Sequence, residues 1–212
     1  MKTILCFGDS NTWGYNHAAT HPAKFRFSRK ERWTGIVQEN LGPEYMVVEE
    51  GLGGRTTVFE DPTAPGRNGL AWLAPCMQSH QPLDLIVFML GTNDVNRLYD
   101  VPATEISRGM EALVKTALNP FLLDTRTPPE ILIISPFHVK NCGIYGSIDA
   151  NAEEKSQQLA SEYELIAKLY GCHFLDCAKV TGPSPTEGIH LNAEGHAALA
   201  KALTKVIKGI LG

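Results

Sequence analysis

The sequence of 212 residues has no long hydrophobic run, because its longest unbroken apolar stretch covers only the six residues 85–90. A helix needs roughly 20 apolar residues to cross a bilayer, so we expect no membrane-spanning segment and no membrane partner. The apolar stretch at residues 4–7 is also too short for the core of a signal peptide. We therefore expect a cytoplasmic protein.

The chain also lacks an excess of positive charge, since its formal net charge is −4. Proteins that bind the phosphate backbone carry a basic patch or stripe, so a nucleic-acid partner is not expected. No C-x-x-C pair occurs among the five cysteines, which are Cys6, Cys76, Cys142, Cys172 and Cys177. Scattered cysteines in odd number are typical of reduced thiols, and we expect neither a metal site nor a cofactor.

What the chain does have is a regular alternation of short apolar runs and longer amphipathic stretches. We expect strands at residues 3–7, 45–50, 83–90, 130–135 and 173–176. Several of them are almost entirely apolar, which is typical of strands covered on both faces. Between and after them, apolar residues recur at helical spacing at residues 33–41, 70–77, 106–117, 159–170 and 199–210, and Asn192 is the expected N-cap of the last helix.

This alternation predicts one α/β domain over residues 1–212, a three-layer α/β/α sandwich around a five-stranded parallel sheet. Five strands favour the flavodoxin-like order 2-1-3-4-5. Such sheets bind ligands beyond the carboxyl ends of their strands, so chemistry is expected there. Two long connections also fall on that edge, residues 16–32 and 137–150, and they either shape access for a substrate or are solvent-exposed decoration.

The first strand is followed by Gly-Asp-Ser-Asn-Thr at residues 8–12. A serine at such a turn can present its hydroxyl, but it is more often a helix cap. The hydroxyl of Ser10 also becomes a useful nucleophile only if a base takes its proton.

Two further strand ends carry groups that suit an oxyanion. The glycine-rich residues 51–57 follow the second strand and offer either a plain turn or backbone N–H groups open to an anion. They match neither the P-loop nor G-x-G-x-x-G. Asn93, in Gly-Thr-Asn-Asp after the third strand, either closes an Asx turn or donates to an oxyanion from a neutral amide.

Before the last helix, Glu187 precedes His190 by three residues with a glycine between them. A carboxylate in this position can accept from one imidazole nitrogen and leave the other free as a base. A hydroxyl, two oxyanion donors and a base with its orienting carboxylate together form the set of groups that acyl transfer requires. The nucleophile elbow G-x-S-x-G is absent, which disfavours the α/β-hydrolase fold.

These blocks resemble the SGNH (GDSL) hydrolases over essentially the whole chain. The resemblance rests on residues 8–10, the glycines around Gly54, Gly-Thr-Asn-Asp at 91–94 and Gly-Ile-His-Leu at 188–191. It implies the SGNH hydrolase fold, with Ser10 as the nucleophile and His190 as the general base. It also implies an oxyanion hole formed by the N–H groups of Ser10 and Gly54 and the side chain of Asn93.

Longer matches, such as residues 6–14, 32–35, 49–52, 55–57 and 89–94, resemble the bacterial arylesterase and acyltransferase branch. The resemblance implies hydrolysis of small aryl and alkyl esters through an acyl-enzyme. It also implies acyl transfer to alcohols or peroxide in some members, and homo-oligomers with restricted channels.

The chain departs from the family pattern D-x-x-H, because Glu187 stands in place of the aspartate. Triads with glutamate exist on other folds, so Glu187 is the expected orienter of His190. Asp176, Asp94 or a backbone carbonyl are the alternatives.

We expect a small-molecule ester as substrate, with Asn11, Tyr15, Thr92 and Ile189 in contact with it and short acyl chains preferred. One alternative keeps this site and changes the substrate to an acetylated sugar. The other, from a different class, is a non-catalytic module that binds an acyl group or an anion in the same pocket.

Overall fold

The structure is a computed structural model and describes residues 1–96, 98–140 and 151–212. Its sheet contains the five predicted strands, all parallel, in the order β2-β1-β3-β4-β5. The predicted sheet order is therefore confirmed. The strands are β1 (Lys2–Gly8), β2 (Tyr45–Gly51), β3 (Leu85–Met89), β4 (Glu130–Ser135) and β5 (His173–Asp176).

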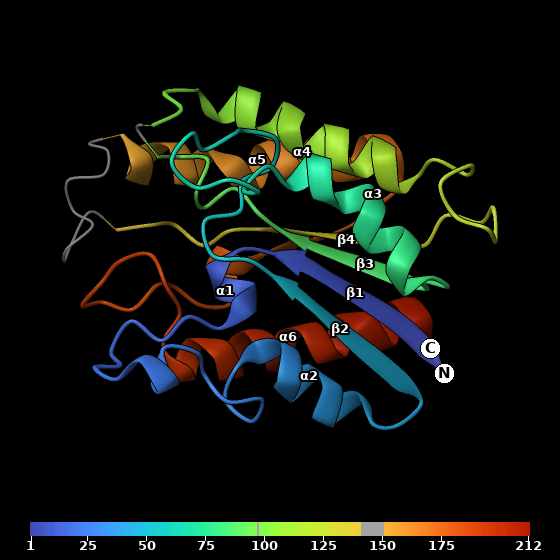
Figure 1. Cartoon of the computed structure of the whole chain (residues 1–212), viewed down its shortest axis with the longest axis horizontal. Coiled ribbons are helices and arrows are strands. Elements are labelled where there is room, and N and C mark those ends of the chain that lie inside the picture. The colour runs from blue at the N-terminus through green and yellow to red at the C-terminus, as the bar shows by residue number, and fades with distance from the viewer. Residues whose placement is uncertain (97, 141–150) are drawn as a thin grey trace.

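Helices cover both faces of this sheet, as Figure 1 shows, which makes the molecule a three-layer sandwich. Helices α3, α4 and α5 pack on one face, and α2 and α6 pack on the other. The α-helices are α1 (Ser10–Trp13), α2 (Trp33–Leu41), α3 (Gly69–His80), α4 (Ala103–Ala117), α5 (Ala152–Tyr170) and α6 (Ala193–Leu211), with short 3₁₀ turns at η1 (Pro22–Lys24) and η3 (Cys177–Lys179).

Burial follows the helical spacing read from the sequence. In α4 the predicted face (Ile106, Met110, Leu113, Val114 and Ala117) is fully or almost fully buried. The central strand β3 is buried along its whole length, as expected for an apolar strand between two helical layers. On α5 the predicted face continues through Tyr163 and Ile166, but Leu169 is 72% exposed and lies outside it.

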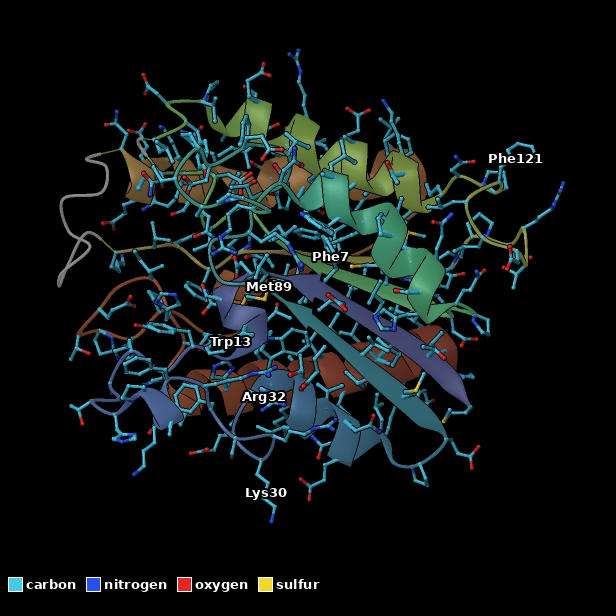
Figure 2. The ribbon with its side chains drawn as sticks, in the orientation of Figure 1. Phe7, Trp13, Lys30, Arg32, Met89 and Phe121 are labelled. Carbon is cyan, nitrogen blue, oxygen red and sulfur yellow. The ribbon has the colours of Figure 1, made fainter. Side chains whose placement is uncertain are left out.

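The carboxyl ends of the strands meet at one edge, where the short helix α1 lies (Figure 1). In Figure 2, Trp13, the last residue of α1, lies near this edge, and Phe121 lies at the other end of the molecule. The end of β2 approaches α1 so closely that a Cβ atom on Gly51 would lie 2.2 Å from the backbone nitrogen of Trp13. The glycine therefore permits the contact that holds α1 against the sheet.

Both long connections begin at this edge. Residues 16–32 fold back on α1, since Arg26 Nε donates to the Trp13 carbonyl over 2.7 Å. The connection after β4 is described as far as residue 140, and residues 141–150, with Cys142, lie outside the described part of the chain. Among the described helices, none combines the length and apolarity needed to cross a membrane.

Candidate active site

Ser10 is the first residue of α1, directly beyond the carboxyl end of β1. The residue that caps this helix is Asp9, whose carboxylate accepts from the N–H of Asn11 over 2.8 Å. The Ser10 hydroxyl is therefore free of the capping role that the sequence left open. It lies 2.9 Å from Nε2 of His190.

His190 connects the serine to a carboxylate. Its Nδ1 lies 2.6 Å from Oε1 of Glu187, and all three side chains in this series are buried. When Nδ1 carries the proton it donates to the carboxylate, and the unprotonated Nε2 then accepts from the serine hydroxyl. This geometry is the one that general-base activation of a hydroxyl requires.

The loop before α6 fixes Glu187 by several hydrogen bonds. Its second carboxylate oxygen accepts from the N–H of Ile189 over 3.0 Å and from the N–H of His190 over 2.7 Å. Gly188 has φ +90°, which lets the chain turn back between the carboxylate and the imidazole. Although burial raises the pKa of the Glu187 carboxyl, its hydrogen bonds with His190 and Ile189 and the charge of His190 outweigh that effect and hold the pKa below its ordinary value.

The two alternative orienters are occupied elsewhere. Asp94 accepts from the N–H of Thr57 over 2.9 Å and from its hydroxyl over 2.5 Å. Asp176 caps η3 by accepting from the N–H of Ala178 over 3.0 Å. Of the carboxylates considered from the sequence, Glu187 is the one that contacts His190.

Gly54 and Asn93 lie on the same cavity as Ser10 and His190. Gly54 has φ +76°, a conformation that favours glycine. The side-chain amide of Asn93 donates to the Arg55 carbonyl over 2.9 Å, and an amide has two N–H donors. One donor thus ties Asn93 to the glycine-rich segment while the other stays available at the cavity.

Arg55 anchors the glycine-rich segment to the sheet. Its guanidinium donates to the Gly8 carbonyl over 3.0 Å and to the Glu50 carbonyl, and it lies 4.1 Å above the ring of Phe7. The segment that carries Gly54 is in this way fixed to both β1 and β2.

The cavity beside Ser10 has a volume of about 360 Å³. Tyr15, Thr92 and Ile189 are among the residues that line it, and the centroids of the Tyr15 ring and the His190 imidazole lie 4.6 Å apart. Val139 and Lys140 also line the cavity, and both belong to the connection 137–150 that the sequence places at this edge. The remaining lining residues were not predicted: Val95 and Asn96 after β3, and Ala152 and Glu153 at the start of α5. Position beyond a strand end is a signal for Val95 and Asn96, whereas Ala152 and Glu153 lie at the start of a helix.

Asn11 differs from the expectation that it contacts the substrate. Its side chain is 1% exposed and is absent from the described residues that line the cavity. Its amide nitrogen donates to the Ile189 carbonyl over 3.2 Å, and its amide oxygen accepts from the N–H of Leu191 over 2.9 Å. Asn11 therefore joins α1 to the loop of His190 rather than reaching the cavity.

An α/β sandwich with a hydroxyl, an imidazole and a carboxylate in series at the strand ends has the features of an ester hydrolase. Comparison with known proteins agrees. A family model of the GDSL-like lipase/acylhydrolase family matches residues 6–198. The chain belongs to this family and is a carboxylic ester hydrolase, which confirms the SGNH (GDSL) resemblance.

Solved structures of esterases are similar to the chain over its full length. An aryl esterase from M. smegmatis is 35% identical with a TM-score of 0.92, and the match covers 100% of both chains. A carbohydrate acetylesterase from Sinorhizobium meliloti is 31% identical with a TM-score of 0.94, and a carbohydrate acetylesterase family member from the same organism is 37% identical with a TM-score of 0.92. Both matches cover 100% of each chain. A comparison with curated protein sequences finds no significant match.

Proposed function

We propose that this enzyme hydrolyses small carboxylic esters through an acyl-enzyme on Ser10. The observation that carries the proposal is the continuous series from the Ser10 hydroxyl through His190 to Glu187, with distances of 2.9 Å and 2.6 Å. His190 takes the hydroxyl proton while the serine oxygen attacks the ester carbonyl. Glu187 holds the imidazole in the required tautomer and stabilises the imidazolium that forms.

The attack moves negative charge onto the carbonyl oxygen. The N–H groups of Ser10 and Gly54 and the amide of Asn93 donate to it, and in a buried site such donors are worth more than in water. The tetrahedral intermediate then collapses, and the alcohol leaves with the proton that His190 returns. A water molecule, activated by the same imidazole, releases the acid and restores Ser10.

For the substrate we propose esters with short acyl chains, such as aryl and alkyl acetates. The similarity to an aryl esterase supports the aryl esters. The cavity of about 360 Å³, with apolar contributions from Val95, Val139 and Ile189, supports a small substrate. A series of p-nitrophenyl esters tests the proposal, and faster turnover of long acyl chains than of acetate would contradict it.

We further propose that an alcohol can replace water in releasing the acyl group. The apolar part of the cavity lining supports this, because it favours an organic alcohol over water at the acyl-enzyme. The test is the formation of benzyl acetate from vinyl acetate and benzyl alcohol, measured beside acetate release. Acetate as the sole product at every alcohol concentration would contradict the proposal.

The second candidate substrate is an acetylated sugar. The two full-length matches to carbohydrate acetylesterase structures support it. The chemistry at Ser10 is unchanged, and only the alcohol part of the ester differs. Faster acetate release from acetylated xylose or glucose than from phenyl acetate would favour this candidate over aryl esters.

The direct test of the nucleophile is Ser10→Ala assayed on phenyl acetate. We expect turnover near the uncatalysed background, because the acyl-enzyme has no oxygen on which to form. Ser161→Ala, on the exposed surface of α5, is the matched control and should behave as the unmodified enzyme. Full activity of Ser10→Ala would reject the proposal.

A further inference from the structure

A second cavity of about 300 Å³ adjoins Ser10. It shares Ser10, Tyr15 and Gly53 with the first cavity and is completed by Trp13, Leu52 and Arg67. His190 is not among the described residues that line it. The proposed hydrolysis does not require this cavity. Its wall is mainly aromatic and apolar and includes one cationic side chain, that of Arg67.

The backbone of Arg67 is hydrogen-bonded to the glycine-rich segment, residues 51–57. Its carbonyl accepts from the N–H of Thr56 over 2.9 Å and from the Thr56 hydroxyl over 3.2 Å. Thr56 also forms a parallel bridge with Asn68. The backbone of Arg67, from which its side chain extends, is therefore held at a fixed position relative to Gly54, which lies two residues before Thr56.

The side chain of Arg67 packs against Gly54. A Cβ atom on Gly54 would lie 3.2 Å from Nε of Arg67 and 3.3 Å from its Cδ. Nε of the Arg67 guanidinium thus lies beside Gly54, the residue whose N–H is a proposed oxyanion donor. The Arg67 side chain is half-buried and lines the second cavity.

The guanidinium of Arg67 forms no direct hydrogen bond or ion pair among residues 1–96, 98–140 and 151–212. Its charge acts at longer range on Asp61, where hydrogen bonds from Thr63 and, to a smaller extent, this charge lower the pKa of the carboxyl. Two buried arginines, Arg32 and Arg55, have hydrogen-bond partners by contrast. Arg32 makes two hydrogen bonds to the Glu49 carboxylate, of 2.9 Å and 2.6 Å, and Arg55 donates to two backbone carbonyls. A half-buried guanidinium with free donors at a cavity wall is suited to bind a carboxylate through two parallel N–H···O bonds.

We propose that Arg67 determines specificity by binding a carboxylate carried by the ester substrate, so that the preferred substrates are monoanionic esters. This inference rests on the proposed function, since it places the ester carbonyl at Ser10. The carboxylate belongs either to the acyl part or to the alcohol part of the ester, and the second cavity accepts whichever part carries it. Trp13, Tyr15 and Leu52 contact the carbon chain that joins the carboxylate to the ester.

The experiment compares esters in pairs that differ only in charge. For the acyl part, the pair is monomethyl glutarate and methyl 5-oxohexanoate, in which a methyl ketone replaces the carboxylate. For the alcohol part, the pair is 4-acetoxybutanoate and 5-acetoxypentan-2-one. The readout is the ratio of kcat/KM for the anionic ester to kcat/KM for its neutral partner, measured for the unmodified enzyme, Arg67→Met and Arg67→Lys.

We expect the unmodified enzyme to prefer the anionic ester about tenfold or more in at least one pair, which is the scale of one charge-assisted contact. Arg67→Met keeps the packing on Gly54 but removes the charge, and should lower that ratio about tenfold or more. Arg67→Lys keeps the charge without the planar fork and should give an intermediate ratio. Arg108→Met removes the same charge from the exposed surface of α4 and should leave the ratio and the activity unchanged.

Three results would overturn the inference: ratios near one in both pairs, a preference that Arg67→Met retains, or an equal loss on both members of a pair. The last would mark a structural role for Arg67. The neutral esters separate this inference from the proposed function. If the unmodified enzyme hydrolyses neither neutral ester nor phenyl acetate, the proposed function fails, whereas their hydrolysis without an anionic preference rejects only the role of Arg67.

Discussion

The side chain of Glu187 is one methylene longer than that of the aspartate in the family pattern, and hydrogen bonds from the surrounding loop hold its carboxylate in position. One oxygen faces the imidazole of His190 at 2.6 Å, and the other accepts from two backbone N–H groups. The carboxylate is thus held from both oxygens, so the extra methylene adds no freedom. The proposed role of Glu187 in orienting the base follows from this fixed position.

Replacing Glu187 with glutamine tests that role. The amide can still accept from the backbone, but it no longer selects the tautomer in which Nε2 of His190 carries no proton. We expect kcat for phenyl acetate to fall by about 10²-fold or more while the thermal midpoint changes little. Glu194→Gln, an exposed change of the same kind on α6, is the control, and unmodified rates for Glu187→Gln would assign the orienting role elsewhere.

The side chain of Asn93 is expected to stabilise the transition state. Asn93→Ala removes one proposed oxyanion donor, and we predict a fall in kcat of about 10²–10³-fold with a small change in KM. Steady-state kinetics on phenyl acetate measure this, with the exposed Asn40→Ala as a control. An unchanged kcat would mean that Asn93 serves only its hydrogen bond to the Arg55 carbonyl.

At this scale the sequence was informative where chemistry depends on a local pattern. Glu187 and His190 lie three residues apart, so their contact was predictable from spacing. The position of Asn11 between two segments far apart in the chain was not, because its partners at residues 189–191 are local only in the fold. The position of Arg67 was equally hard to predict, since nothing in its neighbourhood in the sequence indicates that it lines a cavity with Ser10.

At the scale of elements, the site depends on how α1 meets the loop before α6. Helix α1 has only four residues and cannot be stable by itself, since an isolated helix of this length is far below the marginal size. Its position comes from Gly51, which lets β2 approach, and from Asn11, whose amide binds the loop. These contacts bring Ser10 and His190 together.

Asn11→Ala should therefore affect both stability and activity. It leaves the buried Leu191 N–H and the partly buried Ile189 carbonyl without their partner, which costs about 1–3 kcal/mol of unfolding free energy. We also expect a lower kcat, because the loop of His190 loses its connection to α1. Urea unfolding and kinetics test this beside the exposed Asn119→Ala, and loss of neither property would show that α1 and the loop are held by other contacts.

Elements that alternate between apolar strands and amphipathic helices were predictable. The strands β4 and β5 have the predicted bounds, and Asn192 caps α6 by accepting from the N–H of Gly195 over 2.9 Å. Helix α1 was not predicted, because four residues hold no helical period. Its existence depends on tertiary contacts that the sequence pattern does not contain.

At the scale of the whole molecule, two buried carboxyl groups make stability depend on pH. Burial raises the pKa of Asp94 to about 7, despite its hydrogen bonds from Thr57, and raises that of Asp9 to about 6. In the unfolded chain the pKa of an aspartate is about 3.9. Between about pH 4 and pH 7 the folded state therefore holds more protons than the unfolded state, so this contribution to stability falls as the pH rises.

Asp94→Asn removes the titration at that site while its amide oxygen can still accept from Thr57. We predict that the unfolding free energy of the variant relative to the unmodified protein increases from pH 4 to pH 8. Urea unfolding at several pH values measures this, and the exposed Asp124→Asn is the control. Parallel pH profiles for Asp94→Asn and the unmodified protein would contradict the raised pKa of Asp94.

The most direct measurement of the central claim is labelling with a fluorophosphonate followed by peptide mapping. We expect one phosphonylated residue, Ser10, with labelling abolished in Ser10→Ala and greatly slowed in His190→Ala, where the proposed base is missing. Binding of small esters without any labelling of Ser10, as a non-catalytic module would show, or labelling that does not depend on His190, would contradict it.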